Sequence, residues 1–179
     1  MRLRHIASSI LALLAIATFT QCTTQKHWVG TWGTAGQLVE PHNNPPAPGL
    51  GGNTIRQIVQ VSIGGEEVRL QLTNEFSKEP TEIIAIELAH ATTSGSSSDI
   101  DESTTVSLTF GGKRGITMQP GEIVTSDPVK FAMGDRQNVA ITIHYGEASS
   151  TSVSGHPGSR TTSYIASGNT TDFTNAVRT

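Results

Sequence analysis

The sequence predicts an all-β domain, an antiparallel β-sandwich or jelly roll, and three observations lead to that fold class. In several short segments apolar and polar residues alternate, which is the period of a strand with one buried face. Glycine and proline separate these segments at intervals of about 8 to 12 residues, as in sandwiches. Aromatic residues are only 5% and charged residues 15% of the chain, a composition that favours a β-rich extracellular domain over a helical bundle.

The N-terminus is expected to be an export signal rather than part of the fold. Arg2 and Arg4 form a basic start. The apolar run that follows, from Ile6 to Phe19, is too short to span a bilayer but fits the core of a secretory signal.

Cys22 is the chain's single cysteine and lies directly behind the apolar run. Bacterial lipoproteins carry their lipidated cysteine at this position, which predicts a membrane anchor. Gln21 departs from the usual small residue, so ordinary cleavage with free secretion stays open. We expect a lipoprotein signal peptide over 1–21, a tether over 22–27 and the sandwich over 28–179. The protein would then be exported to the cell envelope, at the outer membrane or cell surface, anchored to the membrane without spanning it.

The clearest strand pair is expected on either side of Gly64-Gly65. Glycine reaches the positive φ angles of a two-residue hairpin turn without strain, which predicts a hairpin here. The apolar positions that alternate with polar ones are Ile55, Val59, Val61 and Ile63 before the turn and Val68, Leu70 and Leu72 after it.

Four further strands are predicted by the same alternation. They cover residues 81–91, with Ile84, Ile86 and Leu88 on one side, residues 104–110, residues 138–146 and residues 161–166. Gly111-Gly112 is expected to turn the chain after the second of these. The proline-rich stretch 39–52 cannot be a strand interior or a helix, and the low-complexity stretch 92–103 is expected to be a solvated loop.

Charge and spacing argue against several classes of function. A net charge of −3 gives no reason to expect nucleic acid as a partner. The six histidines lack metal-ligand spacing, and Asp99 and Asp101 are not followed by the remaining ligands of a calcium loop. Lys113 lies in a glycine-rich turn without the spacing of a phosphate-binding loop, and no serine lies in a nucleophile motif. We therefore expect no metal and no cofactor.

Four blocks of the sequence carry a resemblance to a known family. The blocks are "HWVGTWGTAGQLVEPHNNPP", "NTIRQIVQVSIGGEEVRLQLTNEF", "LTFGGKRGITMQPGEIVTSDPV" and "GHPGSRTTSYIASGN". In this order they resemble the N-terminal β-sandwich region of secreted bacterial SGNH (GDSL-type) esterases. The resemblance runs from about Trp28 to Asn169, which is nearly the whole predicted domain.

The resemblance implies an accessory role rather than catalysis by this chain. In that family the sandwich precedes an α/β/α hydrolase domain, whose nucleophile lies in a Gly-Asp-Ser block and whose histidine lies in an Asp-x-x-His block. Here Gly134-Asp135 continues with Arg136, and no catalytic block is present. We expect the chain to be inactive alone and to position substrate or dock an SGNH hydrolase domain, missing or separately encoded, in removing acyl esters, for instance from polysaccharides.

Two other interpretations compete with this accessory role. The first is a free-standing carbohydrate-binding or adhesive surface module. The second is one half of an enzyme, which joins a separately encoded hydrolase.

Six residues are candidates for contacting substrate or the partner domain. His156 and Arg160 lie in a Pro-Gly loop, which is alternatively a plain turn with Tyr164 packing behind it. Without a serine partner, no catalytic role is expected for His156. Trp28 and Trp32 are expected on one face of a first strand, as a sugar platform or as core and interface residues. Arg56 and Asn74 are expected as edge hydrogen bonders or as contacts for the partner.

Overall fold

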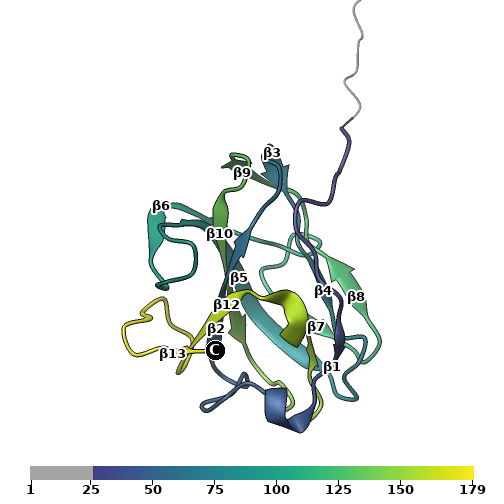
Figure 1. The fold of residues 1–179 in the computed structure, drawn as a ribbon. Coiled ribbons are helices and arrows are strands. Elements are labelled where there is room, and N and C mark those ends of the chain that lie inside the picture. The colour runs from purple at the N-terminus through teal and green to yellow at the C-terminus, as the bar shows by residue number, and fades with distance from the viewer. Residues whose placement is uncertain (1–25) are drawn as a thin grey trace, which may run out of the picture. The chain divides into compact units, whose positions relative to one another are not determined.

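The computed structural model describes residues 26–179, so the expected signal peptide and Cys22 lie outside the described residues. Residues 26–30 belong to a different unit from residues 31–179, and all that follows concerns residues 31–179 unless stated. Its elements are β1 (Gln37–Leu38), η1 (Pro41–Asn43), β2 (Thr54–Gln60), β3 (Gly65–Val68), β4 (Gln71–Thr73), β5 (Thr81–Ala91), β6 (Ile100–Ser107), β7 (Ile116–Met118), β8 (Ile123–Thr125), β9 (Val129–Met133), β10 (Asn138–Tyr145), β11 (Ser154–Gly155), η2 (Pro157–Ser159), β12 (Thr162–Ala166) and β13 (Val177–Arg178). Figure 1 shows their arrangement.

A seven-stranded antiparallel sheet forms the larger layer, in the order β13-β12-β2-β10-β5-β6, with β7 also paired to β5. The second layer consists of two short ladders, β3 with β9 and β4 with β8. This arrangement confirms the predicted all-β, antiparallel, sandwich-like fold.

The two layers enclose the main core. Alternating residues of the large sheet, such as Ile55, Ile86, Leu88 and Ile141, are buried against side chains of the short ladders, including Phe131. Val68, Leu70 and Leu72 pack on the same cluster, as the alternation predicted. We call this side of the large sheet the core face.

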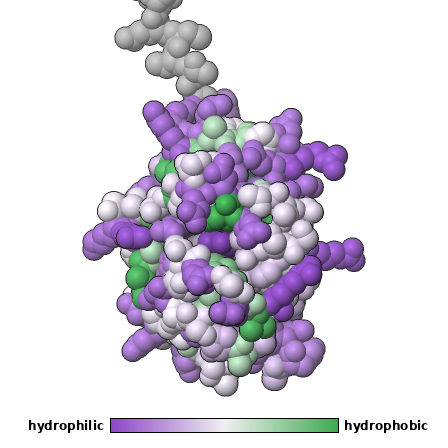
Figure 2. Space-filling model, turned by 90° about the vertical axis from the view of Figure 1, so that its left-hand side faces the viewer, coloured by the Kyte–Doolittle hydropathy of each residue, from purple (hydrophilic) through white to green (hydrophobic). Residues whose placement is uncertain are grey.

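The opposite side of the large sheet, here called the outer face, is different in kind. It carries a smaller cluster of Ile58, Ala140, Tyr164, Ala166 and Phe173. The loop 92–99 and the C-terminal segment, residues 167–179, lie over it, since Tyr164 Oη donates to Gly95 O (2.8 Å) and Arg56 lies 4.0 Å from the centre of the Phe173 ring. Figure 2 views the molecule from the side on which β6 and β13 lie, where apolar residues form only separate patches among hydrophilic ones.

The hairpin predicted at Gly64-Gly65 is wrong. β2 pairs with β10 and β12, whereas β3 pairs with β9, so the chain passes from one layer to the other at this point. Gly64 is needed for another reason, because a Cβ there would clash with the backbone of Met133 and Gly134.

The turn predicted at Gly111-Gly112 is present. Both glycines have positive φ, 57° and 77°, and Phe110 and Lys113 pair across them. The Asp127 carboxylate accepts hydrogen bonds from both glycine amides (3.1 and 2.7 Å) and from Thr109 Oγ1 (2.6 Å). These hydrogen bonds lower the pKa of Asp127, that of Thr109 contributing most.

Three smaller predictions need correction. Ile84 is exposed and Ile83 is buried, because a β-bulge shifts the register of β5 against β10. The stretch 92–103 is only partly a solvated loop, since β6 begins at Ile100 and Gly95 is buried. The proline-rich stretch contains the short 3-10 helix η1, which begins at Pro41, a residue whose missing amide hydrogen is tolerated in a first turn.

Candidate functional site

The outer face holds a buried polar row around Arg56, whose side chain is 4% exposed. β2 is an inner strand of the sheet, so Arg56 is not the edge residue that the sequence suggested. Its Nε donates to Thr142 Oγ1 (2.9 Å) and its Nη1 donates to Ser98 O (2.8 Å). Burial lowers the pKa of Arg56, while the charges of Glu87, Asp99 and Glu102 act in the opposite direction.

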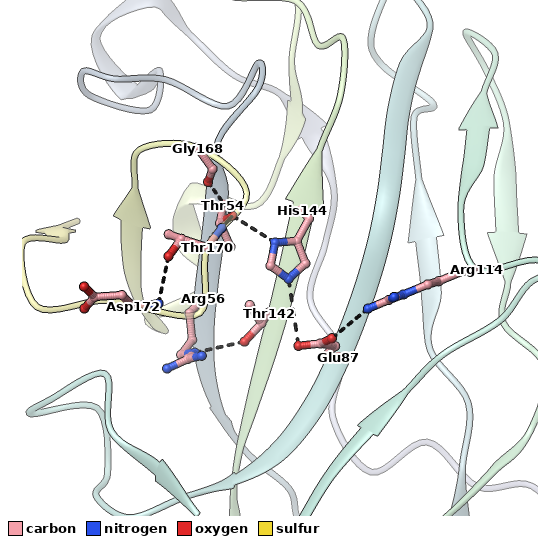
Figure 3. A network of polar contacts seen from close by, with 9 residues as sticks. All are labelled: Thr54, Arg56, Glu87, Arg114, Thr142, His144, Gly168, Thr170 and Asp172. Carbon is pink, nitrogen blue, oxygen red and sulfur yellow. Dashed lines mark hydrogen bonds and ion pairs between the residues drawn. The ribbon is translucent and has the colours of Figure 1, made fainter. Parts of the chain in front are cut away.

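Beside Arg56, a carboxylate, an imidazole and a hydroxyl follow one another across three strands (Figure 3). Glu87 Oε2 on β5 lies 3.9 Å from His144 Nε2 on β10, and His144 Nδ1 lies 3.0 Å from Thr54 Oγ1 on β2. Arg114 Nη2 holds the other Glu87 oxygen at 3.1 Å. Antiparallel register places these side chains together, because Thr142 lies opposite Glu87 on one side and opposite Arg56 on the other.

Glu87, His144 and Thr54 are arranged like the acid, base and nucleophile of a hydrolytic triad. Their hydrogen bonds are nevertheless those of a structural network. Thr54 is fully buried, and its hydroxyl donates to Gly168 O (2.8 Å) while accepting from Thr170 N (3.2 Å). A nucleophile must reach its substrate and give its proton to the base, and this hydroxyl can do neither. The network therefore joins strands to the C-terminal segment.

The surroundings of His144 favour the neutral form of its ring. Burial is the main cause of its lowered pKa, and the charges of Arg114 and Arg56 lower it further, against the opposing effect of Glu87. Sequence reasoning missed this network, because a histidine, a glutamate and a threonine far apart in sequence have no local motif. The available signal was period two, which puts Thr54, Arg56 and His144 on the face opposite the apolar residues of their strands.

His156 and Arg160 flank the 3-10 helix η2 and lie in different settings. The His156 ring packs edge-on against Trp32, with ring centroids 5.9 Å apart. Arg160 is exposed and adopts a left-handed backbone conformation with φ 56°. Ser159 N donates to His156 O, Ser159 Oγ lies 2.7 Å from Thr161 Oγ1, and Tyr164 is buried, so the loop has the local bonds of a turn.

The tryptophans do not lie in a first strand, which corrects that expectation. Trp28 belongs to the separate N-terminal unit and is exposed, whereas Trp32 packs on the main core. The residues around Trp32 are irregular because β1 begins only at Gln37.

Asn74 is also not an edge residue. It is 2% exposed, its Nδ2 donates to Glu79 O and Met118 O (2.9 and 3.2 Å), and its Oδ1 accepts from Thr81 Oγ1 (3.1 Å). A buried amide with three internal partners stabilises the turn after β4 and leaves no free group for a ligand.

Within residues 26–179, no cluster of three or more histidine, cysteine, aspartate or glutamate side chains has the geometry to hold a metal ion. None of the helices in this described part is long and apolar enough to cross a membrane.

No protein-family model matches the chain, and no curated protein matches it significantly.

Proposed function

We propose that this chain is the non-catalytic β-sandwich portion of an SGNH-type acyl-ester hydrolase, which positions an acylated substrate or docks the hydrolase domain. The proposal rests on one observation: three of the sequence blocks that resemble this family contact one another in the fold. β1 of the first block pairs with β11, which leads into the last block, and Trp32 of the first contacts His156 of the last. The end of the second block joins them, because Phe76 N donates to Ser154 Oγ (2.8 Å).

The same place carries a candidate docking surface, defined here as Trp32, Leu38, Phe76 and His156. Leu38 lies opposite Ser154 and is 44% exposed, and Phe76, whose amide donates to Ser154 Oγ, is 38% exposed. Neighbouring exposed apolar side chains on a domain are typical of an interaction site. Arg160 is exposed and follows η2, which begins directly after His156, and it suits a junction because its planar guanidinium binds carboxylates and carbonyls.

Hydrolysis by the chain alone is the first test. The purified chain is incubated with p-nitrophenyl acetate, and we expect no release of nitrophenol above the buffer rate. Turnover that a serine-reactive inhibitor abolishes would contradict the proposal, because it would require a nucleophile in this chain.

Docking is tested by co-expression with an SGNH hydrolase domain encoded next to the chain. We expect co-purification, and we expect Leu38→Ser with Phe76→Ser to weaken it. Val177→Ser is the matched control, since Val177 is 40% exposed and lies on β13, on the opposite side of the molecule from β1 in Figure 1. Equal loss with Val177→Ser would show that docking does not use this surface.

The alternative, a free-standing carbohydrate-binding module, is favoured by one observation. Trp32 and His156 present two rings in contact beside polar groups, and an aromatic ring is a suitable platform for a sugar. Binding of the chain to a polysaccharide array, lost in Trp32→Ala, without any co-purifying hydrolase would decide for this alternative.

A further inference from the structure

The turn at Gly111-Gly112 borders an open groove between the start of β5 and the start of β7. The groove has a volume of about 720 Å³, a size typical of small-molecule sites. Its lining includes Glu82, Ile84, Phe110, Lys113, Ile116 and Thr117. None of these residues belongs to the candidate docking surface or to the polar row of the outer face, so the groove is a separate place on the domain.

The apolar side of the groove exists because of the β-bulge in β5. Tyr145 pairs with Ile83 and His144 pairs with Ala85, so Ile84 is the extra residue of the bulge. Its side chain is 42% exposed, whereas that of Ile83 is 2% exposed and belongs to the core. Bulges often redirect a side chain in this way beside functional sites. Ile84 therefore gives the groove an apolar surface without weakening the core.

The opposite wall is a turn that is held in place on both sides of Lys113. Before Lys113, the Asp127 carboxylate accepts from the two amides of Gly111-Gly112 (3.1 and 2.7 Å). After it, Arg114 Nη2 lies 3.1 Å from Glu87 Oε1, as Figure 3 shows. Lys113 itself is exposed and lines the groove. Because both of its neighbours along the chain are fixed, the turn presents the ammonium group of Lys113 from a defined position.

Gly115 brings the two walls together. A Cβ there would lie 2.7 Å from Ile83 O and 2.8 Å from Ile84 O. Only glycine lets the chain pass this close to the backbone of β5. On the β5 wall, Glu82 Oε2 accepts from Glu147 N (3.1 Å), which orients the carboxylate. The groove thus combines a fixed acceptor, a donor on a fixed turn and an apolar surface.

We propose that this groove binds an O-acetylated saccharide, a class of ligand that rests on the proposed function. A carboxylate and an ammonium group both line the groove, so an anion or a cation is opposed by one of them, whereas a neutral ligand with donors and acceptors suits both. Lys113 donates to the carbonyl oxygen of the acetyl ester, and Ile84 packs against its methyl group. Glu82 and Thr117 bind the ring hydroxyls.

This assignment deepens the role of the domain in positioning a substrate. A polysaccharide carries acetyl groups on several of its units, and an open groove admits one unit of a longer chain. The groove would hold one acetylated unit while the hydrolase domain acts on another.

The test is NMR titration of the isotope-labelled full chain with O-acetylated fragments of xylan, glucomannan and cellulose. Each is compared with the same fragments after alkaline deacetylation. We expect at least one acetylated fragment to shift the amides of Ile84, Lys113 and Thr117. Its dissociation constant should rise by about tenfold on deacetylation, because a hydrogen bond to a charged group is lost. If no fragment binds, or if the acetylated and deacetylated forms bind equally, the proposal is wrong.

Lys113→Met separates the ammonium group from the rest of the groove, because it keeps the length of the side chain and removes the donor. The preference for the acetylated fragment should disappear in this variant. Lys130→Met is the matched control, since Lys130 is also exposed but lies on β9, whose Phe131 packs on His90 at the other end of β5. Equal loss in Lys130→Met would assign the effect to net charge and overturn the proposal.

Trp32→Ala distinguishes this groove from the aromatic platform at Trp32 and His156. Binding that is lost in Trp32→Ala and kept in Lys113→Met would place the sugar on the platform and overturn the assignment of the groove. Neither result bears on docking, which co-purification with the hydrolase domain tests separately, so a failure of this inference and a failure of the proposed function remain distinguishable.

Discussion

The two faces of the large sheet are built by the same strands but stabilised by different means. The core face buries aliphatic side chains such as Ile86 and Ile141 against the second layer. The outer face buries Thr54, Arg56, Thr142 and His144, which are connected by hydrogen bonds and covered by a loop and the C-terminal segment. Apolar packing needs only the right size and pattern, whereas a polar network fails when one member loses its partner. We therefore expect the core face to set the stability of the fold and the outer face to respond to its environment.

The largest effect is expected on the core face. Ile86 is fully buried at the centre of the main cluster. Ile86→Ala removes its side chain and leaves a cavity, which should lower the free energy of unfolding by about 2–5 kcal/mol. Chemical denaturation followed by circular dichroism measures this value. A loss under about 1 kcal/mol would mean that the site collapses around the smaller residue and that the core face is less tightly packed than described.

A smaller loss of stability is expected when a larger side chain replaces a small buried residue on the outer face. Ala140 is fully buried among Ile58, Tyr164 and Phe173, so its smallness is a packing requirement. Ala140→Leu should destabilise by about 1–3 kcal/mol, because overpacking forces its neighbours to move. The same denaturation experiment tests it. An unchanged stability would show that the cover over this face is loose enough to yield, which would sharpen the contrast with Ile86.

The ease with which the two faces are predicted also differs. Alternation in residues 55–61 and 138–146 places the core-face residues correctly, since a period of two follows from strand geometry alone. The same alternation cannot show that Arg56 is buried, because its cover comes from Ser98 and Phe173, which are distant in sequence.

The failed hairpin at Gly64-Gly65 has the same cause as these missed contacts. A glycine pair predicts a turn from local conformation, while Gly64 is small here because another strand's backbone passes close by. Where a residue's neighbours are local, as at Gly111-Gly112, the sequence was sufficient.

Titration should affect the two faces at opposite ends of the pH range. Burial lowers the pKa of His144 on the outer face from 6.5, so the unfolded state binds the proton more tightly. The contribution of neutral His144 to the free energy of unfolding is fully present above about pH 6.5, the pKa of the unfolded state. It is lost as the pH falls through the lower pKa of the folded state. On the core face, burial raises the pKa of Tyr145 to about 12, so stability from Tyr145 is present below pH 10 and is lost as the pH rises toward 12.

Denaturation midpoints measured from about pH 5 to about pH 12 test both the loss of stability in acid (the acid limb) and the loss in alkali (the alkaline limb). The wild type should lose stability on acidification, and His144→Asn should lose less, since it removes the titrating group. Tyr145→Phe serves as the matched variant of the other face and should leave the acid limb unchanged while removing the alkaline one. An acid limb of equal slope in wild type and His144→Asn would assign the effect to carboxylates instead.

The smallest global effect is expected from Arg56→Met, although Arg56 contacts three elements. Burying a guanidinium has a large desolvation cost, which the charges of Glu87, Asp99 and Glu102 offset only in part. An apolar side chain of similar length avoids that cost while still packing against Phe173. The lost hydrogen bonds to Thr142 and Ser98 act in the opposite direction. We expect the free energy of unfolding to stay within about 1 kcal/mol of the wild type.

Amide exchange of the loop 92–99 should increase nonetheless, because in Arg56→Met Ser98 O loses the donor that connects this loop to the sheet. If global stability instead falls as far as in Ile86→Ala, the polar row contributes to the fold as a core does, and the distinction between the two faces is wrong.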